Sequence, residues 1–159
     1  MRMRKSYASL YLPERLSHDL FIEPGEIYPL TLGKRKKGVV VEEAKKDEGE
    51  SWASINSLLA KALGLPGPTS LNIIREKNTL RLGPIVGIMA GMFKRDKGSF
   101  GAQDRFFRSL LSSMRAMHGM AFVFTPTDID VQRQIIQGYY LGGDMEKKWQ
   151  RHWFPFPDV

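Results

Sequence analysis

The sequence contains no cysteine and only three histidines, His18, His118 and His152, which lie far apart. The absence of cysteine excludes disulfide bonds, thiolate zinc or iron–sulfur sites and a cysteine nucleophile. The spacing of the histidines argues against a histidine-rich metal site. Long apolar runs are also missing, because the longest, Ile85–Phe93, spans nine residues, against the roughly 20 that a membrane-spanning helix needs.

The N-terminus carries Arg2, Arg4 and Lys5, which resemble the charged start of a signal peptide. The apolar stretch behind them, Tyr7–Leu12, is too short for such a peptide and ends at Pro13. We therefore expect an intracellular, soluble protein that does not span a membrane.

The chain of 159 residues is 42% hydrophobic and 26% charged, which is typical of a globular protein with one domain or two small ones. Its net charge of +7 permits a phosphate-rich partner without establishing one. The one dense cluster of cations is Lys34, Arg35, Lys36 and Lys37, between Gly33 and Gly38. This pattern predicts a hairpin tip, whose cations are either solvated or in contact with phosphates.

An internal repeat occupies the first half of the chain. Its first copy contains Leu12, Leu16, Leu20, Ile22 and Pro24-Gly25, and its second contains Ile55, Leu59, Leu63, Leu65 and Pro66-Gly67. Leucines four residues apart mark one face of a short helix, and the Pro-Gly pair ends it. Each copy therefore reads as strand, short helix, turn, strand, hairpin and strand.

The strands of this repeat are predicted at Ser6–Leu12, Ile27–Leu32, Gly38–Val41, Ser51–Ile55, Ser70–Ile74 and Thr79–Leu82. One copy cannot cover its own apolar face, but two copies can close around a shared core. We expect a duplicated small β-barrel over residues 1–82, with the charged segment Glu42–Glu50 as an exposed linker. The pattern is similar to the cradle-loop barrels, which include the double-psi barrel.

The second half, residues 83–159, has an α/β pattern. Its predicted elements are a strand at Gly83–Gly91, a loop at Lys94–Gly101, a helix at Ala102–His118 and a strand at Met120–Thr125. This order predicts a right-handed βαβ unit with a parallel strand pair. A short helix at Asp128–Gln137, a third strand at Gly138–Leu141 and an aromatic tail at Trp149–Val159 complete the prediction.

Ligands of α/β sheets bind at the carboxyl ends of parallel strands, where this sequence places glycine-containing loops. The first loop holds Gly91 and the run Gly98–Gly101, and the second holds Asp128. The glycines permit either a close approach to a ligand or merely a tight turn. Asp128 is either a helix N-cap, which Asp favours, or a ligand contact. The glycine spacing is neither the dinucleotide fingerprint nor a P-loop, and no catalytic constellation is apparent.

Four segments resemble, in order and spacing, the YheC/YheD family of endospore coat-associated, ATP-grasp-like proteins. They are Leu82–Ile88, Phe100–Phe107, Phe122–Asp130 and Phe154–Val159. The resemblance implies that residues 83–159 form a Rossmann-like pre-ATP-grasp domain on the acceptor-substrate side of a cleft. It also implies that the family continues beyond this point into ATP-grasp lobes that hold ATP and magnesium. None of those ligands can be assigned to this chain, so we expect neither tight ATP binding nor ATP hydrolysis.

The resulting hypothesis is that the chain is the N-terminal, non-catalytic portion of an ATP-grasp-type ligase, and that it binds a small-molecule or peptide acceptor. Its candidate substrate-binding residues are Gly91, Gly98, Ser99, Phe100, Gly101, Gln103, Arg105 and Asp128. Arg105 either faces a carboxylate or is an ordinary surface arginine. One alternative is a nucleic-acid-binding module that uses Lys34–Lys37 with Arg2, Arg4 and Lys5, and another is a structural protein of the spore coat. Trp153, Phe154 and Phe156 are expected to lie exposed in this chain and to favour self-association.

Overall fold

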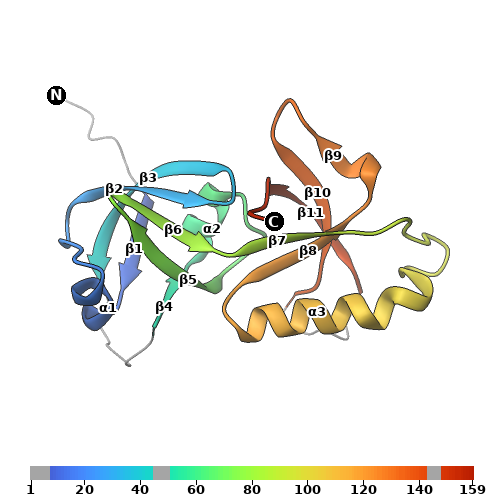
Figure 1. Ribbon diagram of the computed structural model, residues 1–159, viewed down its shortest axis with the longest axis horizontal. Helices are drawn as coiled ribbons and strands as arrows, with labels where there is room; N and C mark the ends of the chain where they lie inside the picture. Colours follow the sequence, from blue (N-terminus) through green and yellow to red (C-terminus); the bar gives the residue numbers. More distant parts are fainter. Residues whose placement is uncertain (1–7, 45–50, 143–147) are drawn as a thin grey trace. The chain divides into compact units, whose positions relative to one another are not determined.

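A computed structural model describes residues 8–44, 51–142 and 148–159 of the chain. Figure 1 shows the arrangement of its helices and strands. The chain divides into two compact units: residues 1–31 with 35–82, and residues 32–34 with 83–159. Among the described helices, none has the length and apolar character needed to cross a membrane.

The first unit repeats the order strand, helix, strand, strand, as the sequence predicts. The first copy consists of β1 (Ala8–Leu12), α1 (Glu14–Asp19), β2 (Ile27–Leu32) and β3 (Arg35–Glu43). The second consists of β4 (Trp52–Ile55), α2 (Ser57–Leu63), β5 (Thr69–Glu76) and β6 (Thr79–Gly83). Residues 45–50 of the predicted linker lie outside the described residues.

The six strands form a closed barrel in the order β1-β3-β2-β6-β5-β4, which confirms the predicted small barrel. Apolar side chains alternate along the strands, so that Leu10, Val39, Val41, Leu71 and Leu80 are fully buried. The two copies do not have equivalent neighbours. Strand β1 pairs in parallel with β3, whereas β4 pairs antiparallel with β5.

Each helix of the barrel is followed, within two residues, by a residue in the left-handed backbone region. Gly64 follows α2 with φ +77°, and Phe21, at the corresponding place in the first copy, has φ +54° and is 83% exposed. An arginine lies at each helix end. The guanidinium of Arg75 donates to the carbonyls of Leu20 and Phe21, while that of Arg35 lies against Gly64 where a Cβ would otherwise be. Both contacts place a cation where a helix exposes its last carbonyls.

The second unit contains a five-stranded sheet and one long helix, which with the barrel makes the fold mixed α+β. Its elements are β7 (Ile85–Met89), η1 (Gly101–Gln103), α3 (Asp104–Ala116), β8 (Met120–Phe124), η2 (Pro126–Asp128), β9 (Ile129–Asp130), β10 (Ile135–Tyr140) and β11 (Gln150–Pro155). The strand order is β11-β10-β8-β7, with β9 on β10. β7 and β8 are parallel, as predicted, and the pairs β8–β10, β9–β10 and β10–β11 are antiparallel.

The helix predicted at Asp128–Gln137 is wrong. Pro126–Asp128 forms one turn of 3-10 helix, and the chain then makes the β9–β10 hairpin. Asp130 accepts a hydrogen bond from the Arg133 N–H, and Gln134 has φ +54°, so the segment turns instead of continuing as a helix. Ile136 is then buried on β10 because it pairs with Phe154, more than 15 residues away along the chain.

The predicted exposure of the aromatic tail is also wrong for Phe154. Residues 150–155 form β11, in which Phe154 is fully buried and Trp153 is 46% exposed. The Phe154 ring stacks on Phe122 with a centroid distance of 4.4 Å. Gly138 leaves room for this stack, because a Cβ there would lie 2.4 Å from the Phe122 ring. Phe154 is therefore part of the core of its own unit, while Trp153 stays exposed as predicted.

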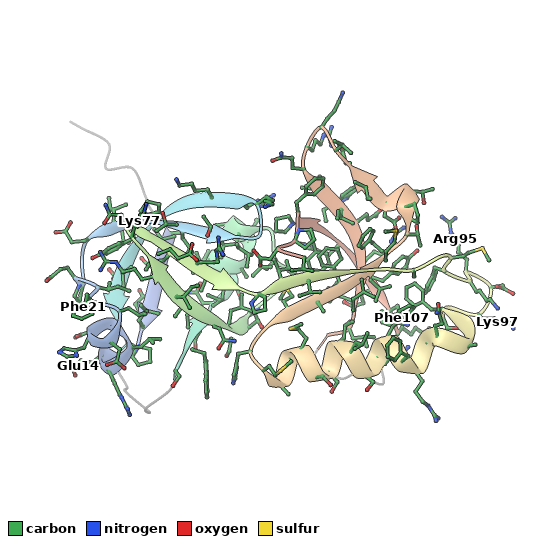
Figure 2. All side chains as sticks on the ribbon, in the orientation of Figure 1. Glu14, Phe21, Lys77, Arg95, Lys97 and Phe107 are labelled. Carbon is green, nitrogen blue, oxygen red and sulfur yellow. The ribbon has the colours of Figure 1, made fainter. Side chains whose placement is uncertain are left out.

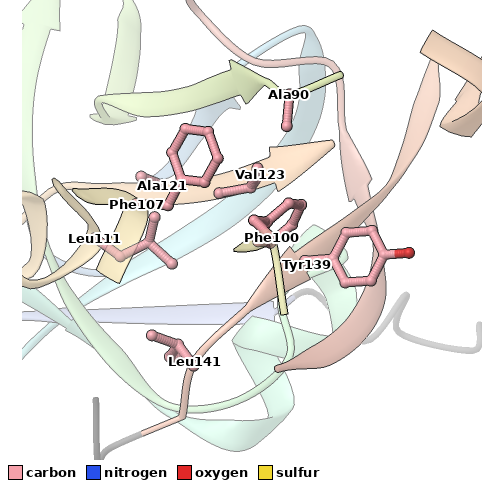
Figure 3. Close-up of a cluster of buried hydrophobic side chains, with 8 residues drawn as sticks. All are labelled: Ala90, Phe100, Phe107, Leu111, Ala121, Val123, Tyr139 and Leu141. Carbon is pink, nitrogen blue, oxygen red and sulfur yellow. The ribbon is translucent and has the colours of Figure 1, made fainter. Parts of the chain in front are cut away.

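Helix α3 packs on the sheet through a cluster of buried apolar residues, shown in Figure 3. The cluster consists of Ala90, Phe100, Phe107, Leu111, Ala121, Val123, Tyr139 and Leu141. Its members come from the end of β7, the following loop, α3, β8 and β10. This core therefore ties the loop after β7 to the strands that carry it.

Candidate functional site

The candidate site lies at the carboxyl ends of β7 and β8. Their parallel register runs from Ile85 opposite Met120 to Met89 opposite Phe124. The two strands therefore end at the same level, and the loops that follow, residues 90–103 and 125–128, leave the sheet at one edge. This is the edge at which α/β sheets bind ligands.

Two aromatic side chains anchor the first loop. Phe93 stacks on Tyr139 at a centroid distance of 4.3 Å, and Phe100 makes edge contacts with Phe93, Phe107, Tyr139 and Trp149. Because the Phe100 ring is only 5% exposed, it supports the loop from the core instead of presenting itself to a ligand. A site residue proposed from the sequence thus has a packing role.

Between these anchors the loop makes a tight turn. The Lys94 N–H donates to the Ser99 carbonyl at 2.8 Å, and Gly98, with φ +60°, has no heavy atom within 4 Å of the place a Cβ would take. Ser99 Oγ accepts from the Gly101 N–H at 3.2 Å, and the Lys94 side chain lies over Gly101. The glycines of this loop therefore serve a turn, and Gly91 and Gly98 also leave open space.

Cations gather on this loop and on the first turn of α3. Lys94, Arg95, Lys97 and Arg105 are all exposed, and none has an ion pair with another described residue. Figure 2 shows Arg95 and Lys97 directed away from the rest of their unit. Gln103 is exposed beside them. The sequence-based candidates Gly91, Gly98, Gln103 and Arg105 thus lie on accessible surface that carries a positive charge.

Asp104 holds the loop and the helix together. Its Oδ1 accepts from the Phe100 N–H at 3.0 Å and from Trp149 Nε1 at 2.7 Å, and its Oδ2 accepts from Arg108 Nε at 2.7 Å. Burial by itself raises the pKa of the Asp104 carboxyl. The hydrogen bonds from Arg108, Phe100 and Trp149 outweigh burial, so the pKa lies below its ordinary value of 3.8. Asp104 is therefore ionised at neutral pH and fixed in place.

Asp128 is not the helix N-cap, which is one of the two roles that the sequence predicts for it. Thr125 is the N-cap of η2, and Asp128 Oδ2 accepts from the Thr125 N–H at 2.8 Å and from the Thr125 hydroxyl at 2.9 Å. Its other oxygen, Oδ1, accepts from Arg151 Nη2 at 2.5 Å. Asp128 is thus the third residue of a capping box and the partner of an arginine from β11.

Arg151 is the site residue that the sequence reasoning missed. Its guanidinium lies 4.3 Å from the centre of the Tyr139 ring, and its Nη2 also donates to the Gln137 carbonyl at 3.1 Å. No sequence signal could have indicated it, because the antiparallel register that places Arg151 opposite Tyr139 joins separate segments. Through its bond to Asp128, Arg151 lies at the same edge as the two loops.

The cations predicted at the hairpin tip of the barrel are distributed differently. Lys34 lies in the turn and is exposed, and Lys36 and Lys37 are exposed at the start of β3. Arg35 is half-buried, and its guanidinium lies against Gly64 instead of extending from the turn with Lys34. The remaining members of the proposed phosphate-binding set, Arg2, Arg4 and Lys5, lie outside the described residues.

The described ranges hold no group of three or more acidic or histidine side chains that could bind a metal ion. No family model, curated protein or solved structure matches the chain. The geometry of the site is therefore the basis for its function.

Proposed function

We propose that this chain is the N-terminal, non-catalytic portion of an ATP-grasp-type, ligase-like protein of the YheC/YheD kind, and that its second unit binds an anionic acceptor. In this proposal the first unit is a duplicated cradle-loop barrel. The second unit is a Rossmann-like pre-ATP-grasp domain, which the β–α–β unit of β7, α3 and β8 supports. ATP and magnesium belong to lobes outside this chain.

One observation carries the acceptor site: the parallel ends of β7 and β8 bring two loops to one edge of the sheet. That edge is accessible at Gly91 and Gly98 and is lined by the exposed cations of the first loop and α3. Cations without an internal counter-ion favour a ligand that carries carboxylate or phosphate groups. The absence of a catalytic constellation in the sequence fits a role in binding.

The proposal is tested by titrating the full chain with glutamate and with inorganic phosphate at constant ionic strength, followed by amide NMR. We expect shifts to cluster at residues 91–101 and 125–128. Lys97→Glu is expected to weaken binding several-fold, because it reverses one exposed charge at the edge. Lys61→Glu, at an exposed position on α2 of the barrel, is the matched control and should leave binding unchanged.

Shifts confined to the barrel, or equal losses from both charge reversals, would contradict an acceptor site at this edge. The non-catalytic part of the proposal has its own measurement. Calorimetry with ATP and magnesium should detect no micromolar binding, and phosphate release should show no saturable ATPase activity. Either one would mean that this chain contains a nucleotide site.

A second candidate, nucleic-acid binding by the barrel, is favoured by the exposure of Lys36 and Lys37 at the start of β3. Neither lysine has an ion pair with another described residue. Contacts with phosphates predict an affinity for duplex DNA that falls steeply as salt rises. An affinity that is undetectable, or that is unchanged by a double Lys36→Gln, Lys37→Gln replacement, would rule this candidate out.

A further inference from the structure

We propose that Arg151 is the residue that binds the acceptor's carboxylate group, with Asp128 as the residue that positions it. This inference rests on the proposed function, because it names the ligand class and the recognising residue of the same edge. It differs from the sequence-based hypothesis, in which Asp128 or Arg105 contacts the ligand.

The guanidinium of Arg151 is held from two sides. Asp128 Oδ1 and the Gln137 carbonyl both accept from Nη2, and the Tyr139 ring supports its flat face. Phe93 stacks on Tyr139 in turn, so the support is continuous with the anchored loop after β7. An arginine fixed in this way loses little further freedom when it binds a ligand, which favours affinity.

The rest of the guanidinium is available. Within the described part of the chain, no hydrogen bond engages Nε or Nη1 of Arg151, which together carry three N–H donors. The Arg151 side chain is 31% exposed, whereas that of Asp128 is only 10% exposed. The buried partner thus orients the arginine, and the arginine, whose side chain is partly exposed, keeps three donors that no described group engages.

The charge of Asp128 selects among anions. Because its carboxylate already neutralises Arg151, a dianionic phosphate at the free donors would meet a like charge nearby, and a singly charged carboxylate would meet less repulsion. The geometry therefore favours a carboxylate. Asp128→Asn removes the negative charge but keeps an oxygen that can accept from Arg151, so the ratio of phosphate affinity to glutamate affinity should rise.

The same unit contains a matched control outside the two loops. Arg133 also pairs with an aspartate, because its Nε lies 3.8 Å from Asp130 Oδ2. Its side chain is 79% exposed, and it lies in the turn between β9 and β10. An arginine of this unit that takes no part in acceptor binding should therefore behave like Arg133.

The experiment measures glutamate and phosphate binding by the full chain, with ¹⁵N spectra that include the arginine Nε signals, at constant ionic strength. We expect the Arg151 Nε signal to shift with glutamate and Arg151→Gln to lower glutamate affinity by about tenfold or more, the effect of one lost charge-assisted hydrogen bond. Arg133→Gln should change that affinity less than about twofold. Unfolding curves for both variants test whether each still folds. If Arg151→Gln does not fold, Arg151→Lys is measured in its place.

The outcomes separate the two proposals. If glutamate shifts the amides of residues 91–101 but its affinity survives the loss of Arg151, the proposed function stands and the role of Arg151 is refuted. If neither anion binds the unmodified chain, both are refuted. If phosphate binds the unmodified chain more tightly than glutamate does, the assignment of a carboxylate is overturned.

Discussion

The role of Asp104 at the base of the candidate site gives the sharpest stability prediction. Replacing Asp104 with alanine removes the acceptor for three donors, the Phe100 N–H, Trp149 Nε1 and Arg108 Nε. A hydrogen bond to a charged group contributes about 1.5–3 kcal/mol. Three bonds at the low end would total about 4.5 kcal/mol, and partial rehydration of Arg108 and Trp149 reduces the expected loss to about 3 kcal/mol.

Asp130→Ala is the matched control, because Asp130 is also an aspartate with an arginine partner in the same unit. Its carboxylate accepts from the Arg133 N–H at 3.1 Å, and the ion pair with Arg133 Nε is 3.8 Å long between side chains that are 32% and 79% exposed. Such an exposed pair contributes little, so the expected loss is about 0.5–1 kcal/mol.

The assay is thermal or urea unfolding of the full chain, followed by circular dichroism. In a unit of this size each kcal/mol corresponds to roughly 4–8 °C, so Asp104→Ala should lower the unfolding temperature of its unit by about 12–24 °C. A loss no larger than that of Asp130→Ala would refute the view that Asp104 holds the loop to the helix.

The same carboxylate predicts a pH dependence. The folded-state pKa of Asp104 lies below its ordinary value, so its contribution to stability is complete above pH 4 or so and is lost as the pH falls through the folded-state pKa. Asp104→Asn lacks this titration. The difference in stability between the unmodified chain and Asp104→Asn should be constant from pH 7 to about 5 and shrink at lower pH. A difference that grows on acidification would contradict the assigned direction.

Two pairs of glycine replacements, one pair in each unit, test the packing. Gly138→Ala should destabilise the sheet by about 1–3 kcal/mol, because a Cβ would lie 2.4–2.9 Å from two buried, stacked phenylalanine rings, whereas Gly142→Ala has no atom within 4 Å and should cost less than about 0.5 kcal/mol. Equal unfolding midpoints for these two variants would contradict the packing argument. In the barrel, Gly64→Ala and Gly25→Ala impose similar backbone strain, because the two glycines have φ +77° and +89°. Only Gly64→Ala displaces the Arg35 guanidinium. Gly64→Ala should therefore be more destabilising than Gly25→Ala by about 0.5–1 kcal/mol. The excess should vanish when both are made in an Arg35→Ala background, and an excess that persists would mean that Arg35 is not its cause.

Much of the local structure follows from the sequence alone. The leucine spacing around Leu16 and Leu59 predicts both short helices of the barrel, and the apolar stripe through Phe107 and Leu111 predicts α3. These elements form as predicted because their periodicity and their end signals lie within one short segment. The parallel pairing of β7 and β8 also follows, since a helix between two apolar strands leaves few other arrangements.

The candidate site was predictable only in part. Sequence reasoning locates its two loops, because the ends of parallel strands can be placed from the strands themselves. It assigns Phe100 to a ligand although the ring is buried, since apolar character does not reveal which side of a loop a side chain occupies. It gives no indication of Arg151, whose position depends on the pairing of β10 with β11.

The sequence by itself thus determined the order of the elements, the two copies of the barrel repeat, and the loops that meet at the edge of the sheet, because these depend on local periodicity and turn chemistry. Only the tertiary structure decided which strands neighbour one another, that residues 129–140 form a hairpin, and that Phe154 is buried on β11. Those outcomes depend on hydrogen-bonded pairing and packing between distant segments, whose free energy no single segment encodes. The same long-range pairing brings Arg151 to Asp128.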